Sequence, residues 1–231
     1  GPVSQMVVSD AHSLIRAVAN APPGAIIYLQ PGTYRLPKGL QIKKSLLLRG
    51  SGKENTYILV DTPGRAAISY LGTGLFSVRD LSVEYIGLGP ADVLSASSGV
   101  VDIRNCVFQG GKWADGSGVF GAGVRLQGIV RGTLHGCICR KNTYGICVSE
   151  QAQPTLEENQ CLENATGIAY FGTSSGVARK NICQKNQYHG IQVSEQAQPT
   201  LEENQCLENL ATGIAYFGTS SGVARKNICQ K

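Results

Sequence analysis

The chain has 231 residues, of which 42% are hydrophobic, and its formal net charge of +5 is modest for this length. The hydrophobic content suffices for a packed core, but no apolar stretch approaches the ~20 residues that a membrane-spanning helix needs. No basic segment is dense enough to indicate a nucleic-acid footprint. We therefore expect neither a membrane nor a nucleic acid among the partners of this protein.

Residues 10–20 predict a short amphipathic helix near the start of the chain. Ser9 and Asp10 are residue types that cap the N-terminus of a helix. The apolar residues that follow recur at helical spacing and share one face: Ala11, Leu14, Ile15 and Val18. The initial Gly-Pro looks like the remnant of a protease site, so we interpret residues 1–22 as a cleavage scar followed by a capping helix.

Residues 23–122 predict short strands at irregular spacing, because brief aliphatic runs alternate with turns rich in Gly and Pro. Near the end of this region, residues 109–122 (QGGKWADGSGVFGA) predict a long loop that holds the single tryptophan of the chain, Trp113. Long loops on a rigid scaffold often carry function. This loop is therefore the main candidate for a unique site.

Residues 123–231 consist of a repeat whose units begin 22 or 23 residues apart. Two segments recur almost unchanged: 145–164 as 190–209, and 167–185 as 213–231. The one difference replaces Cys147 by Gln192. Each unit contains three short strand-like segments separated by turns, which excludes a helical repeat. The pattern predicts one coil of a parallel β-solenoid per unit, with coils stacked ~4.8 Å apart.

Three kinds of residue recur at fixed positions of this repeat. Asn tolerates left-handed backbone and marks turns, and it forms two columns: Asn159, Asn181, Asn204 and Asn227, and Asn142, Asn164, Asn186 and Asn209. A cysteine column predicts small inward hydrophobic residues: Cys139, Cys161, Cys183, Cys206 and Cys229. One Cys per coil gives no clustered ligand set, so we expect no metal and no cofactor. Charged columns alternate in sign, which predicts pairing between coils: Glu157, Arg179, Glu202 and Arg225.

The pattern G-I-x-V, followed by a loop and N-x-C-x-x-N, resembles the right-handed parallel β-helix of the pectin-lyase-like superfamily. The N-terminal third resembles it as well, including the Pro-Gly-Thr-Tyr turn from Pro31 to Tyr34. The resemblance implies an all-β fold: a single right-handed parallel β-helix of three short strands per coil, about eight or nine coils, with an N-terminal capping helix. The domain would span residues 1–231, with irregular coils at 23–122 and regular coils at 123–231 that stop partway through a coil.

Two functions remain open at this level. Enzymes of the resembled superfamily bind their substrate along the first strand of each coil and use carboxylates there. The corresponding outward positions in residues 123–231 carry no carboxylate, so we predict no catalytic residue and favour a non-enzymatic scaffold or interaction module for a protein partner, cut from a larger protein. The alternative is a carbohydrate-binding or polysaccharide-degrading β-helix with its site near the loop at 109–122, built from Trp113, Asp115 and Arg125.

Three further expectations follow from the repeats and the cysteines. The cysteines, arranged singly per coil, suggest reduced thiols and a cytoplasmic location. An open last coil would leave unpaired strand edges and favour end-to-end self-association. The near-identity of the repeated units fits either a recent duplication or a deliberately engineered repetition.

Overall fold

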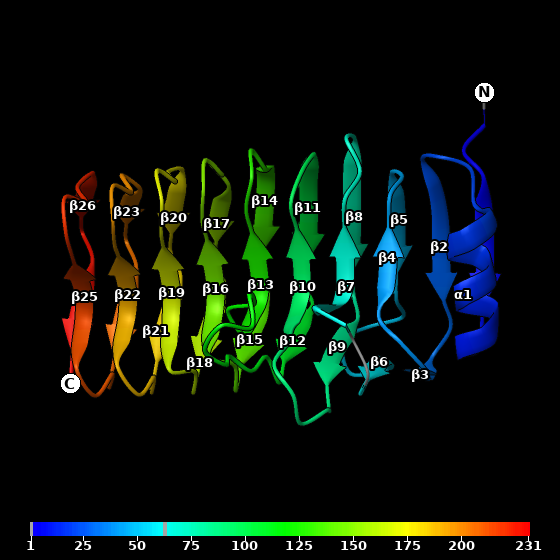
Figure 1. Ribbon diagram of the computed structural model, residues 1–231, viewed down its shortest axis with the longest axis horizontal. Coiled ribbons are helices and arrows are strands. Elements are labelled where there is room, and N and C mark those ends of the chain that lie inside the picture. Colours follow the sequence, from blue (N-terminus) through cyan, green and yellow to red (C-terminus); the bar gives the residue numbers. More distant parts are fainter. Residues whose placement is uncertain (1, 62–63) are drawn as a thin grey trace.

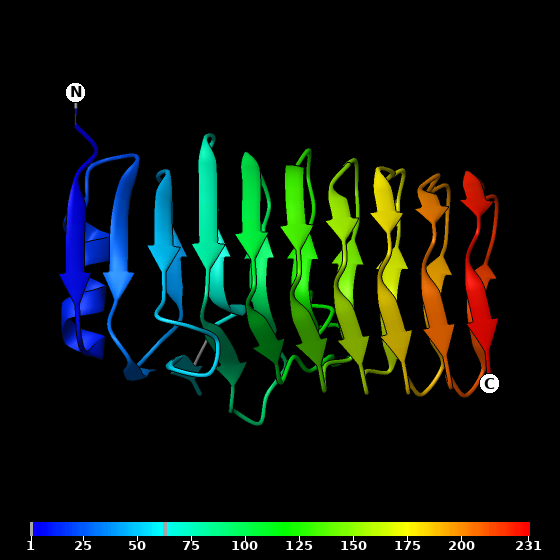
Figure 2. The same ribbon diagram turned by 180° about the vertical axis from the view of Figure 1, so that it is seen from behind.

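The computed structural model describes residues 2–61 and 64–231. These residues form 27 strands and one helix, α1 (Ala11–Asn20). The strands pair in parallel and belong to three sheets, which wind around one continuous hydrophobic core. The coils lie side by side along the long axis of the molecule, with α1 at the N-terminal end and the C-terminus at the opposite end (Figure 1). Figure 2 shows the same stack from behind.

Each complete coil contributes one strand to each sheet. The ten-stranded sheet contains β1 (Gln5–Val8), β2 (Ala25–Leu29), β5 (Leu46–Arg49), β8 (Leu75–Arg79), β11 (Val100–Arg104), β14 (Arg131–His135), β17 (Thr155–Glu157), β20 (Val177–Arg179), β23 (Thr200–Glu202) and β26 (Val223–Arg225). The nine-stranded sheet contains β3 (Gly32–Leu36), β6 (Thr56–Val60), β9 (Ser82–Tyr85), β12 (Val107–Gln109), β15 (Ile138–Arg140), β18 (Gln160–Leu162), β21 (Ile182–Gln184), β24 (Gln205–Leu207) and β27 (Ile228–Gln230). The eight-stranded sheet contains β4 (Leu40–Ile42), β7 (Ala66–Tyr70), β10 (Asp92–Ala96), β13 (Ala122–Leu126), β16 (Tyr144–Val148), β19 (Thr166–Tyr170), β22 (His189–Val193) and β25 (Thr212–Tyr216).

This arrangement confirms the predicted parallel β-helix of three short strands per coil with an N-terminal helix. Complete coils run from β2 to β25, while β1 and the pair β26 and β27 belong to partial coils at the two ends. The inward side chains of successive coils stack on one another, as in the register of Leu94 on Val124 and of Val124 on Ile146. Each coil therefore buries its apolar face mainly against its two neighbours.

Helix α1 forms where the sequence predicts it. The Asp10 side chain accepts the Ser13 backbone N–H at 2.7 Å, and the Ser13 hydroxyl accepts the Asp10 N–H at 3.1 Å, so the two residues form a capping box. Leu14 and Val18 are buried against the first coils, whereas Ile15 on the same apolar side stays 36% exposed. The helix thus covers only part of the N-terminal end of the core.

The cysteine column is the inward ladder that the repeat predicts. Its members pair in register from coil to coil, as Cys139 with Cys161 and Cys161 with Cys183. The eight cysteines are free thiols, and seven of them are buried, while Cys229 in the last strand is exposed. Contacts with the Cys139 and Cys183 thiols, together with burial, raise the pKa of the Cys161 thiol well above its usual range. The cysteines therefore serve as small hydrophobic residues in the core.

The asparagine columns form two buried hydrogen-bonded ladders at the coil corners. Asn181 shows the pattern: its Nδ2 donates to Leu156 O at 2.9 Å and to Asn204 Oδ1 at 2.9 Å, and its Oδ1 accepts from the backbone and side chain of Asn159 at 3.0 Å. The two columns lie at turns between strands, as the sequence predicts. The left-handed residue is the one before each Asn, for example Lys180 at φ 56°, because this kink turns the Asn side chain inward.

The charged column of Glu157, Arg179, Glu202 and Arg225 forms ion pairs between coils, as predicted. Arg179 Nη2 lies 2.7 Å from Glu157 Oε2, and Arg225 Nη2 lies 3.3 Å from Glu202 Oε1. The Arg179 guanidinium holds the pKa of Glu157 below its usual range. These residues lie on the outer side of the ten-stranded sheet, where opposite charges on adjacent strands neutralise one another.

Candidate functional site

The outer side of the eight-stranded sheet carries a row of polar side chains in its first coils. Gln41, Ser69, Ser95 and Arg125 occupy equivalent positions on β4, β7, β10 and β13. In the regular coils this row continues with residues that are small or neutral: Cys147, Ala169, Gln192 and Ala215. The register confirms the outward positions that the repeat predicts. Polar side chains and a charge gather at the N-terminal end of the row.

The loop between β12 and β13 folds over this outer face. An antiparallel bridge between Ala91 and Lys112 holds its first part. Its last part is held by Asp92, whose Oδ1 accepts the backbone N–H groups of Phe120 at 3.2 Å and Ala122 at 2.9 Å. Because these contacts fix both ends of the loop, it forms one wall of a groove along the sheet.

Arg125 connects the sheet to the loop. Its Nη1 lies 3.5 Å from Asp92 Oδ2 and donates to Gly118 O at 3.1 Å. Its guanidinium also stacks over the Phe120 ring, 4.3 Å from the ring centroid. Arg65 Nη2 reaches the same Gly118 carbonyl from the other side of the groove at 2.9 Å. Two arginines therefore hold the tip of the loop.

Together these elements enclose a hollow of about 510 Å³, here called the outer-face groove. Its polar lining consists of hydroxyl, amide and charged side chains: Gln41, Arg65, Ser69, Asp92, Ser95, Ser97, Arg125, Gln127 and Glu150. Leu71 and Val119 contribute apolar surface. A concave site with converging polar groups is the usual form of a ligand-binding site.

Asp92 and Arg125 form a buried ion pair within this groove. The side chain of Asp92 is 2% exposed and that of Arg125 13%. Burial raises the pKa of Asp92, and this effect outweighs the two backbone hydrogen bonds and the nearby Arg125, which lower it. The Arg125 Nε–H is buried and has no hydrogen-bond partner among the described residues. The pair thus combines a desolvated carboxylate with a guanidinium that has one unmade hydrogen bond.

The structure places the three predicted site residues apart. Arg125 lines the outer-face groove, but Trp113 lines a separate hollow of about 240 Å³ with Tyr144, Tyr188 and His189. The Phe120 ring, which packs 5.5 Å from the Phe171 ring, belongs to the loop between these hollows.

Asp115 is exposed at a turn of the loop, and it is not among the lining residues of either hollow. The ligand-binding role of these three residues therefore remains a prediction. Sequence reasoning missed Asp92 as the partner of Arg125. Its position in the sequence could have indicated this role, because Asp92 is the first residue of the strand that precedes the long loop by one coil.

The groove contains few groups suited to a metal or to acid-base chemistry. In the part of the chain that the structure describes, no three His, Cys, Asp or Glu side chains converge as metal ligands would. Glu150 is the second carboxylate of the groove, and its Oε2 accepts the Gly128 N–H at 2.9 Å. No helix within the described ranges has the length and hydrophobicity needed to traverse a bilayer.

The three parallel sheets, wound coil upon coil, define a parallel β-helix protein. The chain belongs to the family described as "right handed beta helix region", whose model matches residues 66–230. This match also establishes the hand of the helix. A sequence comparison with curated proteins gave no significant match.

Solved structures with a similar fold include enzymes that are named for polysaccharides. Pectate lyase Pel9A has a TM-score of 0.71 at 12% identity, with 96% of this chain and 70% of that chain covered. Pectin methylesterase PemA from Erwinia chrysanthemi has a TM-score of 0.62 at 11% identity, with 99% and 93% covered. The Agl-KA catalytic domain has a TM-score of 0.66 at 16% identity, and the match covers 94% of this chain and 42% of that chain. At these identities the likeness concerns the fold alone.

Proposed function

We propose that this protein binds an acidic polysaccharide in the outer-face groove. The observation that carries the proposal is the buried pair of Asp92 and Arg125 in a groove whose other lining side chains are mostly hydroxyls and amides. Sugar hydroxyls donate and accept hydrogen bonds, and Ser69, Ser95 and Gln127 offer matching groups. The similar folds named for pectate and pectin support a carbohydrate ligand over the scaffold function.

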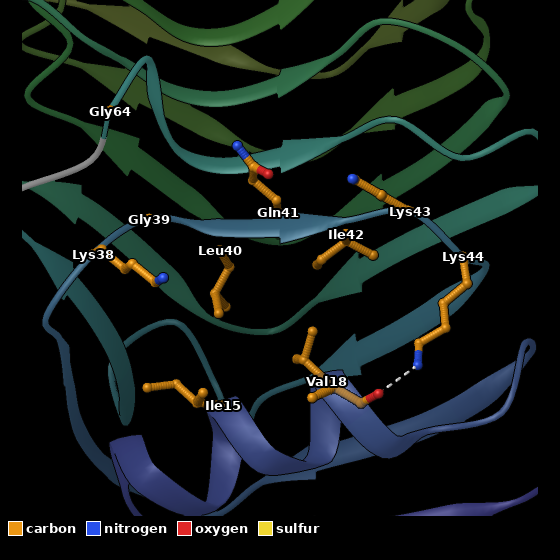
Figure 3. A pocket seen from close by; sticks show the side chains of 11 residues that line it. Ile15, Val18, Lys38, Gly39, Leu40, Gln41, Ile42, Lys43, Lys44 and Gly64 are labelled. Atoms are coloured by element: carbon orange, nitrogen blue, oxygen red, sulfur yellow. Dashed lines mark hydrogen bonds between the residues drawn. The ribbon is translucent and has the colours of Figure 1, made fainter.

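The groove lining holds two arginines, Arg65 and Arg125, and two carboxylates, Asp92 and Glu150, so its charges balance as a whole. The local charge at the loop tip, where the arginines lie, favours a ligand that carries carboxylates. Asp92 is compensated by Arg125, and Arg65 adds a second guanidinium at the loop tip. At the N-terminal end of the row, the side chains of Gln41 on β4 and of Lys43 just after it point away from α1 (Figure 3). Guanidinium groups bind carboxylates through strong charge-assisted hydrogen bonds. A uronate carboxylate bound at the loop tip would pair with the exposed guanidinium of Arg65.

The arrangement supports binding better than cleavage. Hydrolysis of a glycosidic bond needs two carboxyl groups at a set separation on either side of the bond. In this groove, the Asp92 carboxylate faces backbone donors and Arg125, and Glu150 is engaged by a backbone N–H at the far end. Neither carboxylate is free to act while these contacts persist.

The proposal is tested by measuring binding of polygalacturonate, alginate and neutral dextran by isothermal titration calorimetry. We expect the two acidic polymers to bind and dextran not to bind. Arg125→Gln should weaken binding at least tenfold, or about 1.4 kcal/mol, whereas Arg140→Gln on β15, in another sheet, should leave it unchanged. Ser95→Leu provides a second variant, because it fills the floor of the groove without touching the contacts of the loop.

Absence of binding to both acidic polymers, or equal binding by the wild type and both groove variants, would overturn the proposal. The same samples can be monitored for unsaturated uronide absorbance and for methanol released from methylated pectin. Sustained product formation that Arg125→Gln abolishes would show that the groove turns its ligand over as well as binding it.

A further inference from the structure

A second hollow lies at the N-terminal end of the solenoid, between α1 and β4. Its volume is about 750 Å³, and its apolar walls come from Ile15 and Val18 of the helix and from Leu40 and Ile42 of the strand. Figure 3 shows these four side chains facing one another across the hollow. The hollow exists because α1 covers the end of the core only in part, which leaves Ile15 36% exposed.

The strand at this hollow has a free edge. The eight-stranded sheet ends at β4, and within the described residues no strand pairs with its other side. The Leu71 N–H donates to Ile42 O at 2.8 Å, so Ile42 directs its backbone groups toward β7. Adjacent residues of a strand direct these groups to opposite sides. The N–H and C=O of Gln41 therefore point to the hollow.

The charges around this edge have one sign. Lys38 and Lys44 lie at the two ends of the hollow and Lys43 beside it, and its lining among the described residues contains no carboxylate (Figure 3). Lys44 Nζ already donates to Ala19 O at 3.0 Å, which ties the end of the helix to the strand. Such a rim attracts a partner with negative charge.

We propose that the free edge of β4 is a docking site for an extended acidic peptide segment of a partner protein. The peptide adds a strand beside β4, pairs with the N–H and C=O of Gln41, places apolar side chains between Ile15 and Ile42, and directs carboxylates to Lys38. Strand addition of this kind obtains affinity from main-chain hydrogen bonds and specificity from alternate side chains. The proposal does not rest on the carbohydrate function, and the two sites adjoin at Gln41, whose side chain lines the outer-face groove.

The observations favour a peptide over two other occupants. The apolar tail of a fatty acid would fill the hollow but leave the backbone groups of Gln41 buried without partners, which costs ~1–3 kcal/mol for each group. The end of a second solenoid is excluded by shape, because β1, β2 and α1 extend beyond β4 at this end (Figure 1). Lysines on an edge strand also oppose pairing with a like edge. A single acidic strand fills the apolar hollow, pairs with the backbone groups of Gln41 and complements the lysines of the rim.

The test uses a fluorescein-labelled seven-residue peptide of alternating Glu and Val, with an alternating Lys and Val peptide as the charge control. Binding is followed by fluorescence anisotropy up to about 1 mM peptide, a limit that detects a binding free energy of about −4 kcal/mol. The matched variants are Gln41→Pro and Gln41→Ala. Both remove the Gln side chain, but only proline removes the backbone N–H, and proline is tolerated on an edge strand where that N–H faces outward.

We expect the acidic peptide to bind the wild type and Gln41→Ala alike, and Gln41→Pro at least tenfold more weakly. Lys38→Glu and the basic peptide should also show weakened binding. If Gln41→Pro does not fold, amide hydrogen exchange on the wild type replaces it, and slower exchange of the Gln41 N–H on peptide addition is then expected. No binding at about 1 mM, equal binding by the Pro and Ala variants, unchanged exchange at Gln41, or displacement of the peptide by dodecanoate would overturn the proposal.

Discussion

Replacement of Asp92 by Asn and by Ala separates the two contacts of this carboxylate. Its Oδ1 accepts the backbone N–H groups of Phe120 and Ala122, whereas its Oδ2 lies 3.5 Å from Arg125 Nη1. Asparagine keeps an acceptor oxygen and removes the charge. Alanine removes both. The pair of variants therefore shows whether hydrogen bonding or charge holds the loop at residues 109–122 on the sheet.

The structure sets the expected sizes of the two effects. Asp92→Ala leaves two backbone donors without partners, one of them at the fully buried Ala122. An unmade buried hydrogen bond costs ~1–3 kcal/mol, so we expect a loss of about 2–4 kcal/mol in the free energy of unfolding. Asp92→Asn should stay within ~1 kcal/mol of the wild type. The reason is that burial raises the pKa of Asp92, so the folded protein disfavours its charge despite Arg125.

The same pKa shift gives the pH dependence a definite sign. Because the folded-state pKa of Asp92 lies above the unfolded-state value, the ionised carboxylate weakens stability at neutral pH. This deficit disappears as the pH falls through the folded-state pKa to below the unfolded-state one. The wild type should therefore gain stability relative to Asp92→Asn on acidification.

Urea unfolding followed by circular dichroism measures the global stability, and the fluorescence of Trp113 reports on the loop. Asp115→Asn, an exposed change in the same loop, is the control and should shift stability by less than ~0.5 kcal/mol. Two results would refute the reasoning: Asp92→Asn as unstable as Asp92→Ala, or a wild type that loses stability relative to Asp92→Asn as the pH falls.

Three further predictions concern the repeats. Asn181→Ala removes four buried hydrogen bonds and should cost about 3–5 kcal/mol, whereas Asn227→Ala at the half-buried end of the ladder should cost less than half of that in the same urea titration. The chain should self-associate through its last coil, and sedimentation velocity at rising concentration should show dimers that Val223→Glu together with Ile228→Glu abolishes; a monomer at all concentrations would contradict this. In the native protein a thiol reagent should modify Cys229 rapidly and the seven buried thiols only after unfolding, so several fast-reacting thiols would be the contrary result.

Those parts of the fold that follow from periodicity were predictable. A repeat of 22 or 23 residues fixes which residues stack, so the register of Cys139 on Cys161 and the pairing of Arg179 with Glu157 follow from counting. The position of the left-handed residue was not predictable in this way. Lys180 and its equivalents carry the positive φ, because the buried Asn needs its side chain inside the coil, and residue type alone does not distinguish these neighbours.

The candidate site was predictable only in part. Arg125 stood out as the charge in a neutral row beside the long loop. Its contact with Asp92 depends on how the loop folds back, since the two residues belong to adjacent coils separated by an insertion that has no period. The hollow beside β4 depends on the angle at which α1 lies on the end of the core, and an amphipathic pattern does not specify that angle. Both features are products of tertiary packing.

The one difference between the duplicated segments bears on where the protein recognises a ligand. Cys147 and Gln192 both lie in the outward row that contains Arg125. Cys147 is fully buried, whereas Gln192 is half-exposed and its Nε2 donates to Ser194 Oγ at 2.9 Å. The core positions of the two segments are identical, because each must match the coils above and below it. The other positions of the two segments, exposed ones included, are identical as well, so the difference shows only that this outward position accepts either a thiol or an amide. Arg125 occupies the equivalent outward position one coil before Cys147, directly after the long loop.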